Sequence, residues 1–308
     1  MRRWWRALRA APLSLLATIV LGIYLLMALF GGMIAPYPYT LSHEDPANCI
    51  TRANGTTRCS ALANHPPTLA HPMGTDRNGR DVWSRLLVGA GDTIGLPLAA
   101  TSLAVAFGAA LGLTMGYWGG WYDELLSRLM DGLLAIPSLI LALVSLSSLV
   151  PLLEAVESPL VRAIGAVNLA IILVIVLLYT PIVARVVRSA TLAVRDKGYV
   201  EAARLRGEST FAILTREILP VILPTLTVEA ALRFSYAVFL VASLGFLGLG
   251  AQPPRPEWGR MILDARETAL TAPHALWWPI AAIVGLILSI NLAADGWQRA
   301  FRVSGPTE

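Results

Sequence analysis

The sequence predicts an all-α integral membrane protein with six transmembrane helices. Hydrophobic residues make up 56% of the 308 residues and charged residues only 14%, whereas a soluble domain carries about 25% charged residues. Residues 12–35 and 93–118 contain no charge at all, and each run exceeds the roughly 20 apolar residues that cross a bilayer as a helix. The net charge of +4 is too small to indicate a nucleic-acid partner.

The first span is residues 12–35. A basic segment precedes it, as in a signal peptide, but the apolar run is 24 residues long and no small-x-small cleavage site follows. We therefore expect residues 1–35 to form a cytoplasmic N-terminus and a retained first helix. The basic residues are Arg2, Arg3, Arg6 and Arg9.

Residues 36–91 form an outer loop rich in Pro, Asn and Thr, and they contain both cysteines, Cys49 and Cys59. The pair flanks Asn54-Gly55, a strong two-residue turn signal, although an ideal hairpin at that turn would pair Ile50 with Cys59. Two free thiols are the alternative. Disulfides persist outside the cytoplasm, so we expect a bridge.

The same loop contains three of the four histidines, and these raise the possibility of a metal site. Their spacing is irregular and fits no zinc motif. We therefore expect solvated side chains and no metal. The residues considered are His43, His65 and His71, with Asp45 and Asp76.

The second span is residues 93–118, and Asp81 is expected to cap a short separate helix ahead of it. Gly108, Gly112 and Gly116 recur every fourth residue, which allows close helix packing in lipid. We prefer packing to a role in solute binding.

The remaining spans alternate with polar segments. Residues 119–131 are expected inside, followed by a third span kinked at Pro137. The last three spans are residues 167–184, 221–243 and 276–294, separated by an outer loop at 152–166, an inner loop at 185–217 and an irregular outer segment at 244–266.

The placement of basic residues sets the orientation. With six spans and both termini inside, 14 of the 24 Arg and Lys residues fall inside, nine outside and one within a span. This bias agrees with the positive-inside rule.

Glu229 and Arg233 interrupt the fifth span. Charges within a span are costly and are usually paired or face water, and residues four apart share a helix face. The pair either lines a pathway or contacts a second subunit, or it is structural and lies near the inner membrane surface.

The segment 199–220 is the most informative stretch, because it is charged and lies between two spans. Good helix formers precede Gly207, which favours φ > 0 and ends the helix. Ser209 can cap a second short helix over residues 211–217, and Pro220 then opens the next span. The pattern predicts a helix–turn–helix outside the bilayer, whose small residues Ala202 and Ala203 let a partner approach closely.

This segment resembles the Glu-Ala-Ala loop of permease subunits of ATP-binding-cassette importers. Glu201-Ala202-Ala203, Gly207 and Leu219-Pro220 stand at the family's spacings, although Glu217 replaces the usual apolar residue. Three further segments, 71–92, 116–143 and 243–259, resemble signatures of the dipeptide, oligopeptide and nickel branch. The resemblance implies that the loop docks on an ATPase through Tyr199, Glu201, Ala202, Ala203, Arg204, Gly207, Leu219 and Pro220.

The resemblance also implies a five-helix permease core, residues 92–302, with a cytoplasmic coupling loop at 185–220 and one extra N-terminal helix. It implies a bacterial or archaeal inner membrane, a second homologous permease, two ATPase subunits and an outer substrate-binding protein. The chain lacks a phosphate-binding G-x-x-x-x-G-K-[ST] loop, so we expect no enzyme activity and no bound cofactor here, with ATP and Mg²⁺ held by the partners.

The sequence leaves the solute open between peptides and nickel or another metal chelate. An ion-driven secondary transporter would show inverted repeats and charges near the midplane, and a membrane scaffold would not need the docking motif. We expect import of di- and oligopeptides by alternating access.

Overall fold

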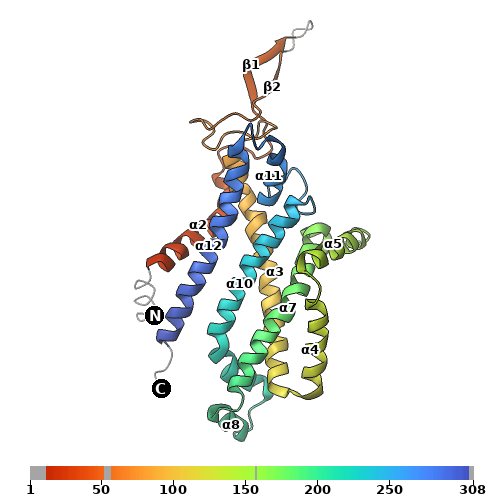
Figure 1. The fold of residues 1–308 in the computed structure, drawn as a ribbon, viewed down its shortest axis with the longest axis vertical. Coiled ribbons are helices and arrows are strands. Elements are labelled where there is room, and N and C mark those ends of the chain that lie inside the picture. The colour runs from red at the N-terminus through yellow and green to blue at the C-terminus, as the bar shows by residue number, and fades with distance from the viewer. Residues whose placement is uncertain (1–11, 52–56, 157, 305–308) are drawn as a thin grey trace. The chain divides into compact units, whose positions relative to one another are not determined.

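Helices dominate the computed structural model, which describes residues 12–51, 57–156 and 158–304 (Figure 1). The first three helices and the hairpin are α2 (Pro12–Ile34), β1 (Glu44–Thr51), β2 (Thr57–Ala61), α3 (Val82–Trp118) and α4 (Gly120–Leu134). The middle of the chain forms α5 (Ser138–Glu154), α6 (Pro159–Ile164), α7 (Ala166–Val194), α8 (Gly198–Leu205) and α9 (Thr210–Ala212). A π-helix (Ile213–Ile218) leads into α10 (Leu219–Phe246), and α11 (Trp258–Ala265), a 3₁₀ turn (Arg266–Thr268) and α12 (Pro273–Ser304) follow.

The count of membrane spans agrees with the expected six. Among the described residues, five helices are long and apolar enough to cross a membrane, and the bent pair α4–α5 makes six if it counts as one span. The all-helical membrane fold with an N-terminal helix is therefore confirmed. Residues 44–61 add a small antiparallel sheet, β1–β2, in the segment where the sequence has a hairpin turn signal.

The chain divides into two units, and helices α2, α3, α10 and α12 contribute residues to both. Unit 1 holds the described residues of Met1–Ile19, Pro97–Ala237 and Ser289–Glu308, and unit 2 holds those of Val20–Leu96 and Val238–Leu288.

Unit 1 is organised by the close approach of α3 and α7. A Cβ added at Gly108 would lie 2.6 Å from Cβ of Val183, and one added at Gly112 would lie 2.7 Å from Cβ of Val187. Ordinary side chains cannot fit at such distances, so the glycine stripe is what lets the two helices touch. This agrees with the packing role expected from the sequence.

Helix α4 replaces the polar inner segment expected at residues 119–131. Asp123 of α4 is buried. Its carboxylate accepts a hydrogen bond from Arg188 of α7, with Arg188 Nη2 lying 2.6 Å from Asp123 Oδ2. Asp131 accepts from Arg185 in the same way. Because these charges find partners on α7, that helix continues ten residues beyond its expected end at residue 184.

The kink expected at Pro137 is instead a complete break. Helices α4 and α5 meet at 89°, and Pro137 is the residue immediately before α5. Proline cannot donate the backbone hydrogen bond of a helix interior, and its ring clashes with the preceding turn. It therefore starts a new helix rather than bending one.

Unit 2 is built around the start of α3 and Trp258 of α11. The Trp258 side chain is fully buried, and its Nε1 donates to the carbonyl of Leu86 over 2.9 Å. The backbone N of Trp258 donates to Oγ1 of Thr93 over 3.0 Å. The short helix expected after Asp81 is thus the first turns of α3 and not a separate element.

Charged side chains within these turns explain why α3 does not stop. Arg85 lies 3.5 Å from Asp76, and Asp92 lies 3.2 Å from Arg255. With its charges paired, the helix runs on through Pro97 to Trp118.

Glu257 caps α11 from within the protein. Its carboxylate accepts from the backbone N of Gly259 over 2.7 Å and of Arg260 over 2.9 Å, which satisfies two free N–H groups of the helix. Only 1% of the residue is exposed. Burial raises the pKa of this carboxyl to about 7, and the two backbone hydrogen bonds oppose that rise.

Replacing Gly112 tests the helix contact in unit 1. We expect Gly112→Val to destabilise the fold by about 1–3 kcal/mol or more, because the new Cβ would lie 2.5 Å from the carbonyl oxygen of Ala184. The measurement is folded permease in membranes and its thermal unfolding midpoint. Gly95→Val is the matched control, since Gly95 is also in α3 and a Cβ there would meet nothing within 4 Å. Equal stability of the two variants would contradict the packing role.

The Glu257 carboxyl should make stability depend on pH. Its folded pKa of about 7 exceeds the ordinary value of 4.5, so the folded state binds this proton more tightly than the unfolded chain. The stabilisation from this proton is therefore fully present below pH 4.5. It falls as the pH rises and is lost as the pH passes through 7. The change over the whole range is about 3 kcal/mol. Unfolding measured from pH 5 to 8 should show this slope, and Glu257→Gln should flatten it. An unchanged slope in the variant would assign the pH dependence to other groups.

Candidate functional site

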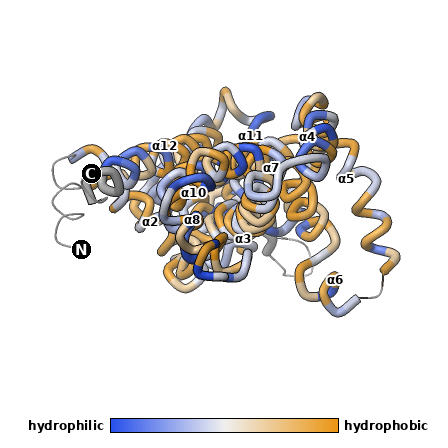
Figure 2. Tube along the Cα trace, turned by 90° about the horizontal axis from the view of Figure 1, so that it is seen from below, coloured by the Kyte–Doolittle hydropathy of each residue, from blue (hydrophilic) through white to orange (hydrophobic). Residues whose placement is uncertain are grey.

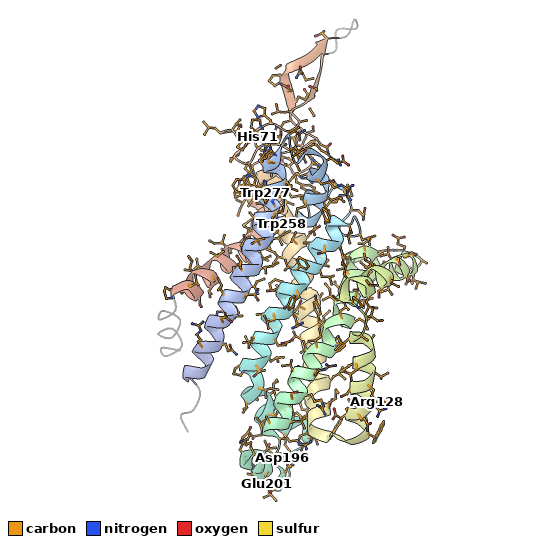
Figure 3. All side chains as sticks on the ribbon, in the orientation of Figure 1. His71, Arg128, Asp196, Glu201, Trp258 and Trp277 are labelled. Carbon is orange, nitrogen blue, oxygen red and sulfur yellow. A yellow bond between two sulfur atoms is a disulfide. The ribbon has the colours of Figure 1, made fainter. Side chains whose placement is uncertain are left out.

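The segment from Tyr199 to Pro220 forms the predicted helix–turn–helix at one end of unit 1. Figure 3 labels Asp196 just before α8 and Glu201 within it, and Figure 2 shows hydrophilic positions on α8. Gly207 adopts φ +75° between the two helical parts, as the sequence predicts. The Ser209 side chain accepts from the backbone N of Ala212, so the expected cap is present.

The second helical part differs from the expectation. It does not end before Pro220, because Thr210–Phe246 is a single helical run with a π-helix at Ile213–Ile218. The wider π turns include Arg216, whose carbonyl is four residues before Pro220 and would otherwise meet the proline ring. The cap at Ser209 therefore begins the membrane helix itself.

One face of α8 is buried in the protein's own core. Val200 and Ala203, three residues apart and therefore on one face of the helix, are both completely buried. They belong to a cluster drawn from α3, α7, α8, the π-helix and the start of α10. Its other buried members are Ala109, Leu113, Val183, Val187, Ile213, Leu214, Ile218, Ile222 and Leu226.

Ala203 is therefore not on a surface that a partner can reach, which corrects the role expected from the sequence. The alanine is small because α8 lies close to the helices beneath it. Ala202 is partly buried, and Leu219 is partly buried against the same cluster. Pro220 is exposed.

The opposite face of α8 and the short helix α9 carry large apolar side chains that sequence reasoning missed. Leu205 is 84% exposed and Phe211 is 76% exposed, on either side of Gly207. Glu201 and Arg204 are exposed on α8, and Tyr199 is 39% exposed. The available signal was a pair of apolar residues beside a turn glycine in a polar segment. Leu205 and Phe211, together with the exposed charged residues Glu201 and Arg204, form what we call the α8 surface.

Polar contacts fix α8 to the end of α3. The Arg204 guanidinium lies 4.8 Å from the ring centre of Tyr117, and its Nε donates to the Tyr117 hydroxyl over 3.2 Å. Arg195, the residue that follows α7, donates from Nη1 to the carbonyl of Gly116 over 3.1 Å, so the end of α7 is attached to the same part of α3. The Arg204 contacts thus attach α8 to the end of α3 within unit 1.

A second set of contacts holds the turn. Arg206 Nη2 lies 2.7 Å from Glu208 and 3.6 Å from Glu217, so one guanidinium joins both sides of Gly207. Partial burial, and then the Glu217 carboxylate, raise the pKa of the Tyr199 hydroxyl. Glu217, which departs from the family's apolar residue, therefore has a partner here.

Glu229 and Arg233 form a largely buried ion pair on α10. Arg233 Nε lies 2.7 Å from Glu229 Oε1, and their side chains are 14% and 10% exposed. The guanidinium lies 5.0 Å from the ring centre of Tyr236 and 5.9 Å from that of Tyr179. Two aromatic faces and one carboxylate thus surround a single cation inside a span.

Cys49 and Cys59 are joined by a disulfide across the β1–β2 hairpin. Cys49 stands opposite Cys59, and Ile50 opposite Arg58. This register differs by one residue from that of an ideal two-residue hairpin, so more residues connect the strands. The predicted Asn54-Gly55 turn lies outside the described residues.

The outer histidines contact other side chains. His71 Nδ1 lies 2.9 Å from the Asp81 carboxylate, and the rings of His43 and His71 pack edge to face at 4.5 Å. Burial, and then His71, lower the pKa of His43. Within the described ranges, no group of three or more His, Cys, Asp or Glu residues could hold a metal ion.

Comparison with known proteins identifies the family. A model described as the binding-protein-dependent transport system inner membrane component matches residues 108–302. A second, the N-terminal TM domain of oligopeptide transport permease C, matches residues 1–67.

Individual relatives agree with these matches. The glutathione transport system permease protein GsiD of Shigella dysenteriae serotype 1 is 34% identical over 96% of this chain and 88% of its own length. GsiD of Escherichia coli O6:K15:H31 has the same identity and coverage. A chain of the inward-facing MetNI methionine ABC transporter shares the fold, with a TM-score of 0.56 at 20% identity over 72% of this chain and 97% of that chain. The chain belongs to the family of inner-membrane permease components of binding-protein-dependent ABC transport systems.

Proposed function

We propose that this permease imports di- and oligopeptides, including small tripeptides of the glutathione type. The relatives named above are glutathione permeases, and the N-terminal match is to an oligopeptide permease. The alternative solutes, nickel or another metal chelate, have no comparable observation in their favour. The family itself excludes the ion-driven secondary transporter and the scaffold.

We further propose the partners and orientation that this family implies. Two ATPase subunits bind ATP and Mg²⁺, a second homologous permease completes the pathway, and an outer binding protein delivers the solute. The Arg distribution supports cytoplasmic termini. The division into an N-terminal part (1–35), an outer loop (36–91) and a core (92–302) is part of the same proposal.

We propose that the α8 surface contacts the ATPase. The observation that carries this proposal is the contrast between the buried side and the exposed side of this segment. Val200 and Ala203 hold α8 on the core, while Leu205 and Phe211 are exposed on a polar background. Fully burying such a side chain contributes about 1.5–3 kcal/mol. Two exposed anchors on a rigid support therefore offer a partner several kcal/mol without unfolding anything.

Coupling follows from the attachments of α8. ATPase closure would move the α8 surface, and the contacts to Tyr117 and to the shared apolar cluster would pass that movement to α3, α7 and α10. Alternating access requires only that the two ATPase states bind the α8 surface differently.

Removing the anchors should uncouple the transporter without unfolding it. We expect Leu205→Ser with Phe211→Ala to reduce ATPase recruitment and uptake about tenfold or more, at normal permease abundance. Gly207→Val should act similarly, because Gly207 has φ +75° and Val is strained there. The measurements are ATPase pull-down and peptide uptake, each normalised to permease abundance.

Two controls sharpen this test. Leu270→Ser removes a side chain that is 99% exposed in unit 2 and should leave recruitment unchanged. Ala203→Trp should lower permease abundance, because Ala203 is completely buried. Wild-type recruitment by the Leu205/Phe211 variant would exclude the α8 surface as the contact.

Glu229 and Arg233 are proposed to line the pathway or to contact the second permease, and a double-mutant cycle tests this. Arg233→Leu alone leaves a buried carboxylate and should destabilise by about 3–5 kcal/mol. With Glu229→Leu added, we expect stability to recover while uptake stays low. Full uptake by the stable double variant would show that the pair is only structural.

A further inference from the structure

Three aromatic rings pack together at the base of the β1–β2 hairpin in unit 2. His43 is the residue immediately before β1, and its ring centre lies 4.5 Å from that of His71 and 4.6 Å from that of Tyr37. The ring centres of Tyr37 and His71 are 5.3 Å apart. Figure 3 labels His71 near the foot of the hairpin. We call Tyr37, His43 and His71 the ring cluster.

Two members of the ring cluster are fixed to the start of α3. His71 Nδ1 lies 2.9 Å from the Asp81 carboxylate, and the two side chains are 8% and 1% exposed. The same carboxylate accepts from the backbone N and from Oγ of Ser84, each over 2.7 Å. The backbone N of Tyr37 donates to that Oγ over 3.1 Å. Tyr37 and His71 therefore keep their places as long as the first turn of α3 is formed.

His43 is the member that ties the hairpin to these two rings. Its backbone N donates to the carbonyl of Gly79 over 2.9 Å, and its own carbonyl accepts from the backbone N of Leu62 over 2.7 Å. Leu62 immediately follows β2, so both ends of the hairpin meet at His43. The disulfide between Cys49 and Cys59 keeps the two strands together. The hairpin would therefore move as one piece if His43 left the cluster.

The closed cluster disfavours a positive charge on the His43 ring. Nε2 of His43 is buried and has no hydrogen-bond partner among the residues that the structure describes. A protonated ring would have to bury an N–H at that place without an acceptor, which is costly. The neighbouring His71 ring would repel it whenever both are charged. Burial, and then His71, lower the pKa of His43 below its ordinary value of 6.5.

No group around the ring compensates for this cost. The Asp81 carboxylate attracts a proton to His43, but burial and His71 outweigh it. The Tyr37 hydroxyl donates to the carbonyl of Ala70 over 3.4 Å. The other titratable side chains described on the hairpin, on residues 62–80 and in the first turn of α3 are exposed or have contacts of their own: Glu44, Asp45, His65, Asp76, Arg77, Arg80 and Arg85.

We propose that the ring cluster is an acid-sensitive latch, which holds the β1–β2 hairpin in place at neutral pH and releases it in acid. A charged His43 ring is poorly accommodated in the closed cluster and is well solvated once it leaves. Tyr37 and His71 stay on α3, so the movement is confined to His43 and the hairpin. Histidine suits this role because its charge changes between pH 5 and 8.

The direction of the pH dependence follows from proton linkage. A detached His43 ring has the ordinary pKa of 6.5, whereas the ring in the closed cluster has a lower one. The open form therefore binds the proton more tightly. The stability of the closed form is complete above pH 6.5 and is lost as the pH falls from there through the lower pKa. Glu257 acts in the opposite sense, because its proton stabilises the fold in acid.

Amide hydrogen exchange on the full-length permease tests the latch. After correction for the intrinsic pH dependence of exchange, His43 and Leu62 should open about threefold more often, or more, at pH 5.0 than at pH 7.5. His43→Phe keeps an aromatic ring that cannot be charged, so opening should be the same at both pH values. His65→Phe is the matched control, because His65 lies in the adjoining loop outside the cluster, and it should respond like the wild type.

Hydrogen exchange at the imidazole C2 carbon follows the His43 proton directly and needs no variant. The midpoint of that exchange should lie below pH 6.5. Three results would each overturn the proposal: a midpoint at 6.5 or above, a wild type whose opening does not increase in acid, or an equal increase in His43→Phe.

Discussion

The contact between α3 and α7 is the interaction on which unit 1 depends. Lipid supplies no hydrophobic force to bring two apolar helices together, so their association relies on close packing. Gly108, Gly112 and Gly116 remove the side chains that would hold α3 away, and α7 presents Val183, Val187 and Thr191 to the space. The apolar cluster beneath α8 includes residues of both helices. The exposed α8 surface therefore has a defined position only because three glycines allow two membrane helices to touch.

Paired charges explain how long these helices become. Arg185 and Arg188 look like loop residues, yet they belong to α7 because Asp131 and Asp123 of α4 neutralise them. Arg85 and Asp92 extend α3 in the same way in unit 2. Charges within a membrane helix are usually paired or face water, and the partners of Arg185 and Arg188 come from α4, an element distant in sequence.

The contrast between local signals and contacts distant in sequence determines what could be predicted from the sequence. Local signals were reliable: Gly207 has positive φ, Ser209 caps the following turn, and the apolar runs became the membrane helices. Features that depend on tertiary contacts were not accessible. Ala203 has the size expected of an interface residue, but only the packed cluster shows which side of α8 it occupies. Likewise, Pro137 marks a change of direction without giving the 89° between α4 and α5.

The burial of Val200 and Ala203 also has a consequence for the order of events during synthesis. Helix α8 has only eight residues, and an isolated helix of that length is unstable in water. It can become ordered only after α3 and α7 have inserted into the membrane and paired, because those helices supply the surface on which it lies. A newly made chain whose membrane core is still unassembled therefore has no formed α8 to display. Any protein that recognises the ordered segment therefore binds only chains in which this part of the membrane core has assembled, so the segment would report on biogenesis.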